Sequence, residues 1–181
     1  MKRIQLTDKI FELSIPFDNI NQAIDSIAVK MNKELKDKNP LFICVLNGSF
    51  MFAADLMKKL TINCQISFVK LSSYDGLKTT GKIKSLIGLD EDLKRRTIVI
   101  LEDIVDTGIT INNMVNQLKE MQPEKIKIAS LFYKPEACQI NIDLDYVGLN
   151  IPNDFVVGYG LDYNGYGRNL RDLYSLVKNE Q

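Results

Sequence analysis

Residues 98–110 read IVILEDIVDTGIT, and this stretch decides the fold class. Ile98 to Leu101 are all apolar, which is typical of a strand buried on both faces of a parallel sheet. Two carboxylates, Glu102 and Asp103, follow the apolar run directly, and Asp106-Thr107-Gly108 then predicts a turn that opens a helix. The apolar face of that helix consists of Ile111, Met114, Val115 and Leu118. A strand that leads through acids and a turn into a helix is the building unit of an α/β fold.

The rest of the chain also alternates predicted strands with predicted helices. Apolar runs and period-two alternation predict strands at 3–15 (short edge strands), 41–46, 62–68, 83–87, 97–101, 125–131 and 155–159. Helical spacing of apolar residues predicts helices at 18–37, which Asp18 could cap, and at 50–60. The pattern indicates an α/β fold, a parallel-sheet core flanked by helices, in a single domain over residues 1–181. Ligands bind such sheets at the carboxyl ends of the strands.

Composition excludes several classes of function. The 23 basic and 23 acidic residues give zero net charge, which argues against a general nucleic-acid binder. The chain has no histidine, so Ser-His pairs, Cys-His pairs and zinc sites that need imidazole are excluded. Acid–base chemistry must then come from carboxylates, lysines, tyrosines or the substrate itself.

The location of the protein is predicted from its cysteines and from its apolar runs. Cys44, Cys64 and Cys138 form no CxxC pair, so we expect free thiols in a reducing compartment. The N-terminus has no apolar signal core, and no apolar run approaches the ~18 residues of a membrane span. We therefore expect a cytoplasmic protein with no membrane partner.

The turn at 106–110 has the chemistry of a phosphate site. Backbone N–H groups at a helix start attract anions, and the hydroxyls of Thr107 and Thr110 add donors. Glu102 and Asp103 would repel phosphate, but they can bind sugar hydroxyls, or Mg²⁺ that bridges to a phosphorylated sugar. Acids also follow strands as helix caps and as metal ligands in other folds, so this chemistry alone leaves the ligand open. No GxxxxGK[ST] segment occurs, which excludes a P-loop.

The whole stretch 98–110 closely resembles the 5-phosphoribosyl-1-pyrophosphate (PRPP) motif of the type I phosphoribosyltransferases. Further segments resemble the hypoxanthine (hypoxanthine-guanine) branch of that family and stand in the family's order. They are LNGS at 46–49, SSY at 72–74, ASLFYK at 129–134 and FVVGYGLDY at 155–163. The resemblance spans residues 5–172. It implies a magnesium-dependent glycosyltransferase of purine salvage that joins the phosphoribosyl group of PRPP to N9 of hypoxanthine or guanine.

The same resemblance implies the architecture around the sheet. A small hood should form from the chain-terminal segments near 3–15 and 150–178. A mobile loop near 72–82, with Ser73 and Tyr74 at its tip, should close over the site. The family forms dimers or tetramers, so a homodimer or homotetramer is expected.

The resemblance also assigns roles on the donor-sugar side. The 5-phosphate and ribose residues are Glu102, Asp103, Val105, Asp106, Thr107, Gly108, Ile109 and Thr110. Asp106 corresponds to the catalytic base at purine N7. Glu102 and Asp103 correspond to metal ligands, together with Asp162. Ile109 stands where many relatives have a lysine.

On the base side, Lys134 corresponds to the contact of the purine 6-oxo group, and Phe155 to the stacking ring. Val156 corresponds to the backbone that hydrogen-bonds the base, and Asp162 also lies near the purine. Pyrophosphate contacts fall on Leu46, Asn47, Gly48 and Arg168. Asn47 replaces a lysine that is common in the family, and the family often has a cis peptide at the position of Leu46–Asn47.

Two alternatives remain open on the sequence. The first is a relative that prefers xanthine, guanine or a pyrimidine. The residues around Lys134, Phe155 and Asp162 favour a 6-oxopurine. The second is a non-catalytic PRPP sensor that binds RNA or DNA. Zero net charge and an intact Asp106 argue against that regulator.

Overall fold

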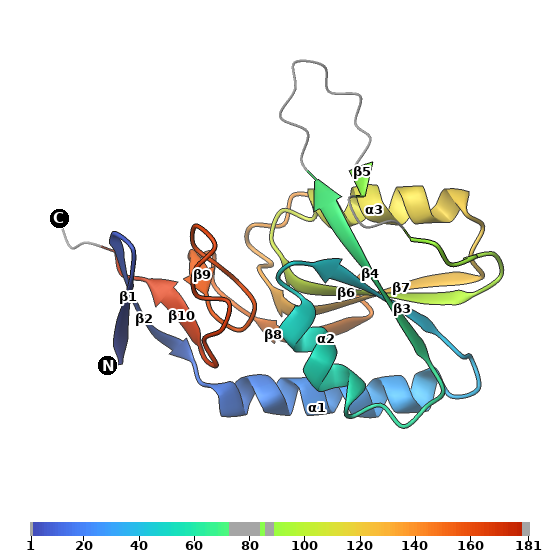
Figure 1. The fold of residues 1–181 in the computed structure, drawn as a ribbon, viewed down its shortest axis with the longest axis horizontal. Helices are drawn as coiled ribbons and strands as arrows, with labels where there is room; N and C mark the ends of the chain where they lie inside the picture. Colours follow the sequence, from blue (N-terminus) through green and yellow to red (C-terminus); the bar gives the residue numbers. More distant parts are fainter. Residues whose placement is uncertain (1, 73–83, 86–88, 179–181) are drawn as a thin grey trace, which may run out of the picture.

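A computed structural model describes residues 2–72, 84–85 and 89–178. The larger of two sheets contains β3 (Leu41–Leu46), β4 (Gln65–Ser72), β5 (Lys84–Ser85), β6 (Thr97–Val105), β7 (Lys125–Tyr133) and β8 (Tyr146–Asn150). The strand order is β5-β4-β3-β6-β7-β8 (Figure 1). Five of these strands are parallel, and β5 pairs antiparallel with β4. The predicted parallel-sheet core is confirmed.

Helices cover both faces of this sheet because its central strands are apolar on both faces. α1 (Phe17–Glu34) and α2 (Phe50–Met57) lie on one face and α3 (Ile109–Glu120) lies on the other (Figure 1). Phe42, Cys44, Val99 and Leu101 pack toward α1 and α2. The alternate residues of the same strands, Leu41, Ile43, Ile98 and Ile100, pack toward α3. The continuous apolar runs in the sequence are explained by this two-sided burial.

The smaller sheet is the hood expected from the chain-terminal segments. It contains β1 (Arg3–Leu6), β2 (Lys9–Ile15), β9 (Val156–Val157) and β10 (Leu173–Leu176), in the antiparallel order β1-β2-β10-β9. Phe11, Val157 and Tyr174 form its buried centre. The hood lies beside the start of α1, at one end of the larger sheet (Figure 1).

Several element boundaries differ from the predicted ones. α1 ends at Glu34, and its N-cap is Pro16, so the expected cap at Asp18 is wrong. A proline fixes φ in the region that a helix start needs, and it takes this place without a side-chain hydrogen bond. β4 begins only at Gln65, three residues after the predicted start.

Two predictions at the sheet edges also change. The edge strand β8 was not predicted, because its sequence YVGLN is short and half-exposed. The strand predicted at 155–159 is reduced to β9, and it pairs with β10 in the hood rather than in the parallel sheet. Gly158 to Gly160 leave the strand because all three have positive φ. In the part of the chain that the structure describes, no helix is long and apolar enough to cross a membrane.

Candidate active site

Most of the residues predicted for the site lie at or just after the ends of β3, β6 and β7, and the others lie in the hood segments. These strands are parallel neighbours, so their carboxyl ends lie at one edge of the sheet, beside the hood (Figure 1). β6 is longer than predicted and extends to Val105, so the acid pair belongs to the strand itself. Glu102 pairs with Ser130 of β7, so the sheet itself holds the part of the strand that carries the two acids.

Glu102 and Asp103 form a buried acid pair. Asp103 is 8% exposed and accepts the backbone N–H of Ile104 at 2.9 Å. Oε2 of Glu102 is buried without a hydrogen-bond partner. Burial raises the pKa of Glu102 well above its ordinary value, and the neighbouring Asp103 raises it further. Burial also raises the pKa of Asp103, although the hydrogen bond from the backbone N–H of Ile104 acts to lower it.

The acid pair has the chemistry of a divalent-cation site. Two buried carboxylates, one with an oxygen that lacks any partner, are oxygen donors of the kind that Mg²⁺ takes. Within residues 2–72, 84–85 and 89–178, no three histidine, cysteine or acidic side chains come close enough to hold one metal ion. Asp162 is therefore not brought together with Glu102 and Asp103, and a cation here would need oxygen atoms from substrate or water.

The phosphate turn follows the acid pair. Gly108 is the N-cap of α3 with φ of 81°, a left-handed conformation that favours glycine. The backbone N–H of Ile109 lies 3.4 Å from Oγ1 of Thr107, a weak contact that leaves the start of α3 open to an anion. A cavity of about 120 Å³ lies at the turn. Its walls are Glu102, Ile104, Val105, Asp106, Thr107, Gly108, Thr110 and Ile111. All the predicted 5-phosphate residues except Asp103 and Ile109 line it.

Lys134 and Asp106 lie together on the base side. Nζ of Lys134 is 2.8 Å from Oδ2 of Asp106, and the backbone N–H of Lys134 donates to Val105 O at 3.0 Å. Only 8% of the Lys134 side chain is exposed, against 46% for Asp106. The structure thus joins the predicted catalytic base to the predicted purine lysine.

The predicted pyrophosphate loop lies between Asp103 and the hood. The Leu46–Asn47 peptide, whose form the sequence leaves open, is cis. Gly48 is buried, and a Cβ there would overlap Oδ2 of Asp103. A Cβ at Gly160 would overlap the carbonyl oxygen of Gly48. Both positions therefore need glycine, because the backbone of the loop is in direct contact with the acid and with the hood.

Arg168 and Asp162 pair with each other beside this loop. The two side chains are 2.6 Å apart, and Arg168 also donates to Gly160 O at 2.8 Å. Asp162 accepts the backbone N–H of Gly165 at 2.6 Å. Arg168 is near enough to Asp103 to lower the pKa of that carboxyl, in opposition to the effect of burial. The predicted pyrophosphate arginine therefore lies close to the acid pair.

Phe155 is an aromatic ring held at the hood surface. It is 48% exposed, and its neighbour Val156 is buried in β9. Tyr163 meets Phe155 edge-on at 5.9 Å between ring centroids, and Phe11 is tilted against it at 6.2 Å. A ring supported from behind with one side open is suited to stacking on a flat base. Ser73 and Tyr74 lie outside the described residues.

Sequence reasoning missed three contributors to this arrangement. Ile104 lines the cavity at the phosphate turn. Strand periodicity could have identified it, because it directly follows the buried Asp103 and its side chain therefore points to the opposite face of the sheet. Phe11 and Tyr163 support Phe155, but they are distant from each other in the chain, and no local pattern links them.

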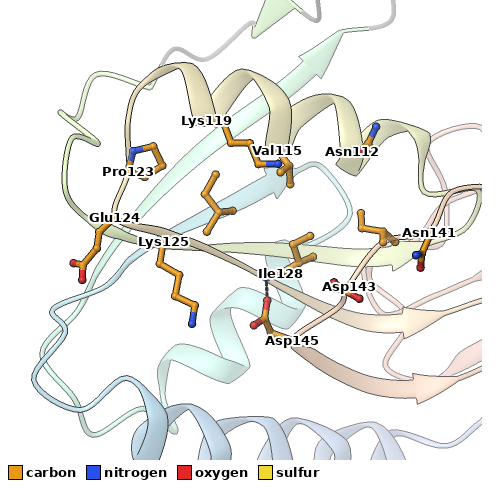
Figure 2. Close-up of a pocket in the computed structure, with 12 residues that line it drawn as sticks. Asn112, Val115, Lys119, Pro123, Glu124, Lys125, Ile128, Asn141, Asp143 and Asp145 are labelled. Atoms are coloured by element: carbon orange, nitrogen blue, oxygen red, sulfur yellow. Dashed lines mark hydrogen bonds between the residues drawn. The ribbon is translucent and has the colours of Figure 1, made fainter.

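A wider hollow of about 520 Å³ lies away from these residues, between α3 and the first half of β7 (Figure 2). Lys119 and Val115 border it on the α3 side, and Lys125 and Ile128 on the β7 side. None of the residues predicted for the site lines it. Asp145 at its edge is already satisfied, because it accepts the backbone N–H of Ile128 at 2.9 Å.

Comparisons with known proteins agree with the arrangement. The family model of the phosphoribosyl transferase domain matches residues 16–164. The hypoxanthine-guanine phosphoribosyltransferase of Streptococcus pyogenes is 42% identical over 154 residues, which is 84% of this chain and 86% of that protein. The enzyme of the same name from Streptococcus pneumoniae is 37% identical over 166 residues, 91% of this chain and 92% of the relative.

Solved structures show the same fold. A hypoxanthine phosphoribosyltransferase from Staphylococcus aureus superposes with a TM-score of 0.86 at 31% identity, covering 92% of this chain and 91% of that one. A hypoxanthine-guanine phosphoribosyltransferase from Bacillus anthracis, with HEPES in its active site, gives the same TM-score and identity over 94% and 99% of the two chains. Because these matches span most of the sequence, the chain belongs to the type I phosphoribosyltransferase family, among its hypoxanthine-guanine phosphoribosyltransferases.

Proposed function

We propose that this chain transfers the 5-phosphoribosyl group of PRPP to N9 of hypoxanthine or guanine through the residues gathered at this sheet edge. Hypoxanthine-guanine phosphoribosyltransferase activity in purine salvage follows from membership of the family, with IMP or GMP and pyrophosphate as products. The observation that carries the residue assignment is the Lys134–Asp106 pair, a cation and a carboxylate 2.8 Å apart.

The pair matches one edge of a 6-oxopurine. O6 and N7 are neighbours on that edge, so Lys134 would donate to O6 while Asp106 faces N7. Adenine carries an amino donor in place of O6, and an ammonium group beside it gains no hydrogen bond. Phe155 would stack on the ring, and the backbone at Val156 would bind the opposite edge of the base.

Asp106 acts as the base during transfer. The bond from C1 to the pyrophosphate oxygen breaks as the N9–C1 bond forms, and the sugar carbon carries positive charge in the transition state. An N7 proton becomes acidic once N9 is bonded to carbon, and Asp106 accepts it. A carboxylate is a weak base at neutral pH, but such assistance contributes about 10²–10⁴ in rate.

Glu102 and Asp103 would bind the ribose part of PRPP, directly or through a cation. Oε2 of Glu102 is buried without a hydrogen-bond partner, and neither acid forms a salt bridge within the described residues, so we assign Mg²⁺ to the pair. Bound there, Mg²⁺ would supply positive charge that offsets the two acids and the leaving pyrophosphate. Asp162, paired with Arg168 and apart from the acid pair, remains the predicted metal-binding acid near pyrophosphate.

Backbone amides carry most of the phosphate binding. The amides from Thr107 to Thr110 and the two threonine hydroxyls would bind the 5-phosphate at the start of α3. Ile109 offers only its amide at this point. Asn47 likewise brings no charge to pyrophosphate, so the amides of the Leu46–Gly48 segment and Arg168 remain as its donors. Ser73 and Tyr74 stay the predicted tip of the closing loop, whose role would be to exclude water.

The decisive assay combines purified protein, Mg²⁺, PRPP and one base at a time, with the nucleotides separated afterwards. We expect IMP and GMP with hypoxanthine and guanine, little XMP with xanthine, and no AMP with adenine. Formation of XMP as the main product would move the chain to the xanthine-preferring alternative. No nucleotide from any purine would overturn the proposal.

Two further expectations concern the setting of the enzyme. The three cysteines carry no disulfide, which supports the expected cytoplasmic, reducing location. A homodimer or homotetramer remains the expectation from the family. Light scattering of the purified protein, read against its monomer mass of 20.6 kDa, distinguishes these assemblies from a monomer.

A further inference from the structure

Tyr159 is a buried tyrosine in a backbone conformation that rarely holds a side chain. It is fully buried, and its φ is 47°, between Gly158 at 102° and Gly160 at 98°. Non-glycine residues with positive φ cost free energy and persist only where surrounding contacts hold them. The contact at the far end of this side chain is a hydrogen bond, which the hydroxyl donates to Oδ2 of Asp55 at 2.6 Å.

Asp55, which accepts this hydrogen bond, belongs to the helix that follows the pyrophosphate loop. It lies in α2, which starts at Phe50, directly after Ser49. Its other carboxylate oxygen is 2.5 Å from Nζ of Lys58. Burial works against the charge of Asp55, but the hydrogen bonds from Lys58 and Tyr159 outweigh it and lower its pKa. The carboxylate is therefore charged at neutral pH, and its bond to Tyr159 is charge-assisted.

A second contact joins the same two segments beside this bond. Gly160, the next residue after Tyr159, touches the carbonyl oxygen of Gly48 so closely that a Cβ would not fit. Gly48 in turn lies against Oδ2 of Asp103. The loop is thus enclosed between the acid pair and the hood, and a shift of the hood segment would change the position of the Gly48 amide.

We propose that Tyr159 and Asp55 are a positioning pair that fixes the pyrophosphate loop, residues 46–49, against the hood for binding the pyrophosphate of the donor. Neither side chain needs to contact substrate. The pair acts through the 158–160 segment on one side and through α2 on the other. The inference rests on the proposed function, because that proposal assigns pyrophosphate to this loop.

The test is Tyr159→Phe, which removes only the hydroxyl. In the forward reaction we expect KM for PRPP to rise about tenfold, the effect of losing one charge-assisted hydrogen bond. KM for hypoxanthine and kcat should stay within about twofold. In the reverse reaction KM for inorganic pyrophosphate should rise likewise, whereas the affinity for IMP should not change. IMP carries the base and the 5-phosphate but no pyrophosphate, so it serves as an internal control.

A matched control exists at the other end of the sheet. Tyr146 is also buried and donates to a carboxylate, Glu34, at 3.0 Å, but neither residue is near the loop. Tyr146→Phe should lower the melting temperature about as much as Tyr159→Phe while leaving KM for PRPP unchanged. If both variants raise KM for PRPP equally, the effect is one of stability and the inference is wrong.

Substitutions at Asp55 test the pair from its other side. Asp55→Asn keeps an oxygen that accepts from Tyr159 and should retain most of the affinity for PRPP. Asp55→Leu removes the acceptor and should behave like Tyr159→Phe, so the inference can be tested even if one variant folds poorly. An active wild type with an unchanged pyrophosphate KM in both Tyr159→Phe and Asp55→Leu would overturn the positioning role alone. A wild type that makes no nucleotide would instead overturn the proposed function.

Discussion

Lys134 and Asp106 form an ion pair, with 2.8 Å between Nζ and Oδ2, at the ends of two neighbouring parallel strands. The register of β6 and β7 pairs Val105 with Tyr133, so the residues one position further along face each other. The ammonium of Lys134 is almost fully buried and has its counter-charge in Asp106. The two groups satisfy one another, and the proposed site of the purine lies where they meet.

Replacing Lys134 by glutamine should damage recognition of the base rather than of the donor. The amide can still donate one hydrogen bond, but it loses the positive charge that favours O6. We expect KM for hypoxanthine and guanine to rise about 10- to 100-fold, in line with the loss of a charge-assisted hydrogen bond. KM for PRPP should change little. Steady-state kinetics with each substrate varied in turn measures both.

Lys125→Gln is the control for this variant, because Lys125 is an exposed lysine at the start of the same strand. It should leave all constants unchanged. Equal values of KM for hypoxanthine in Lys134→Gln and the wild type would remove Lys134 from the purine site.

Replacing Asp106 by asparagine tests the proton transfer. Asparagine keeps the shape and one acceptor oxygen but cannot take the N7 proton. The value of kcat should fall about 10²- to 10⁴-fold, while PRPP still binds with similar affinity. Stopped assays of IMP formation give kcat, and calorimetric titration with PRPP gives the affinity. Lys134 loses its charge partner in this variant, so the melting temperature should be recorded alongside.

A variant that lost PRPP binding together with activity would place Asp106 in donor binding instead. Retention of full activity would show that N7 needs no protein base. Either outcome is distinct from simple unfolding, which the melting temperature detects.

The core of this fold could be predicted from sequence because its signal is local. The apolar runs of β3 and β6 are buried on both faces, and burial of that kind leaves a continuous pattern. The acid pair and Asp106 follow one of these runs in the chain, so their place at the strand end was predictable too. Lys134 could be placed near them because parallel strands end at one edge.

The contacts between the hood and the sheet edge could not be predicted in this way. Gly160 meets Gly48 across more than a hundred positions of sequence, and neither residue carries a side chain that would mark the contact. The strand predicted at 155–159 is shorter in the structure because Gly158, Tyr159 and Gly160 have positive φ, and the hydrogen bond from Tyr159 to Asp55 again joins residues far apart in the sequence. Long-range packing decides such positions.

Phe155 should contribute to base binding through its ring. Phe155→Leu keeps apolar bulk but removes the flat face, and aromatic pairs are worth roughly 0.5–1.5 kcal/mol beyond their buried area. We expect KM for hypoxanthine to rise about 3- to 10-fold, with kcat and KM for PRPP nearly unchanged. Steady-state kinetics gives the three constants.

The stability of Phe155→Leu should change little, because nearly half of the Phe155 side chain is exposed. Tyr166→Leu is a suitable control, since Tyr166 is a more exposed aromatic residue of the 162–168 loop. If the two variants have the same kinetics, Phe155 does not stack on the base.

Glu102 offers a test of the cation site that needs no turnover. Burial and the adjacent Asp103 raise the pKa of Glu102 in the folded protein. The folded state then holds a proton that the unfolded state releases once the pH exceeds the ordinary glutamate value. Stability is greatest at low pH and is lost as the pH rises through the raised pKa. Metal-free protein should therefore melt at lower temperature as the pH is increased from about 5 to 8.

Mg²⁺ should reverse this loss, because a cation that binds only the folded state stabilises it by mass action. Glu102→Gln removes one of two buried like charges, so the metal-free variant should be more stable at pH 8 by roughly 1–3 kcal/mol. That corresponds to a few degrees in melting temperature for a chain of this size. Its melting temperature should depend less on pH and respond less to Mg²⁺, whereas Glu124→Gln, at an exposed acid, should behave as the wild type. Thermal denaturation in EDTA and in millimolar Mg²⁺ measures all three proteins. A wild type that Mg²⁺ does not stabilise at pH 8, with or without PRPP, would show that these acids do not hold the metal.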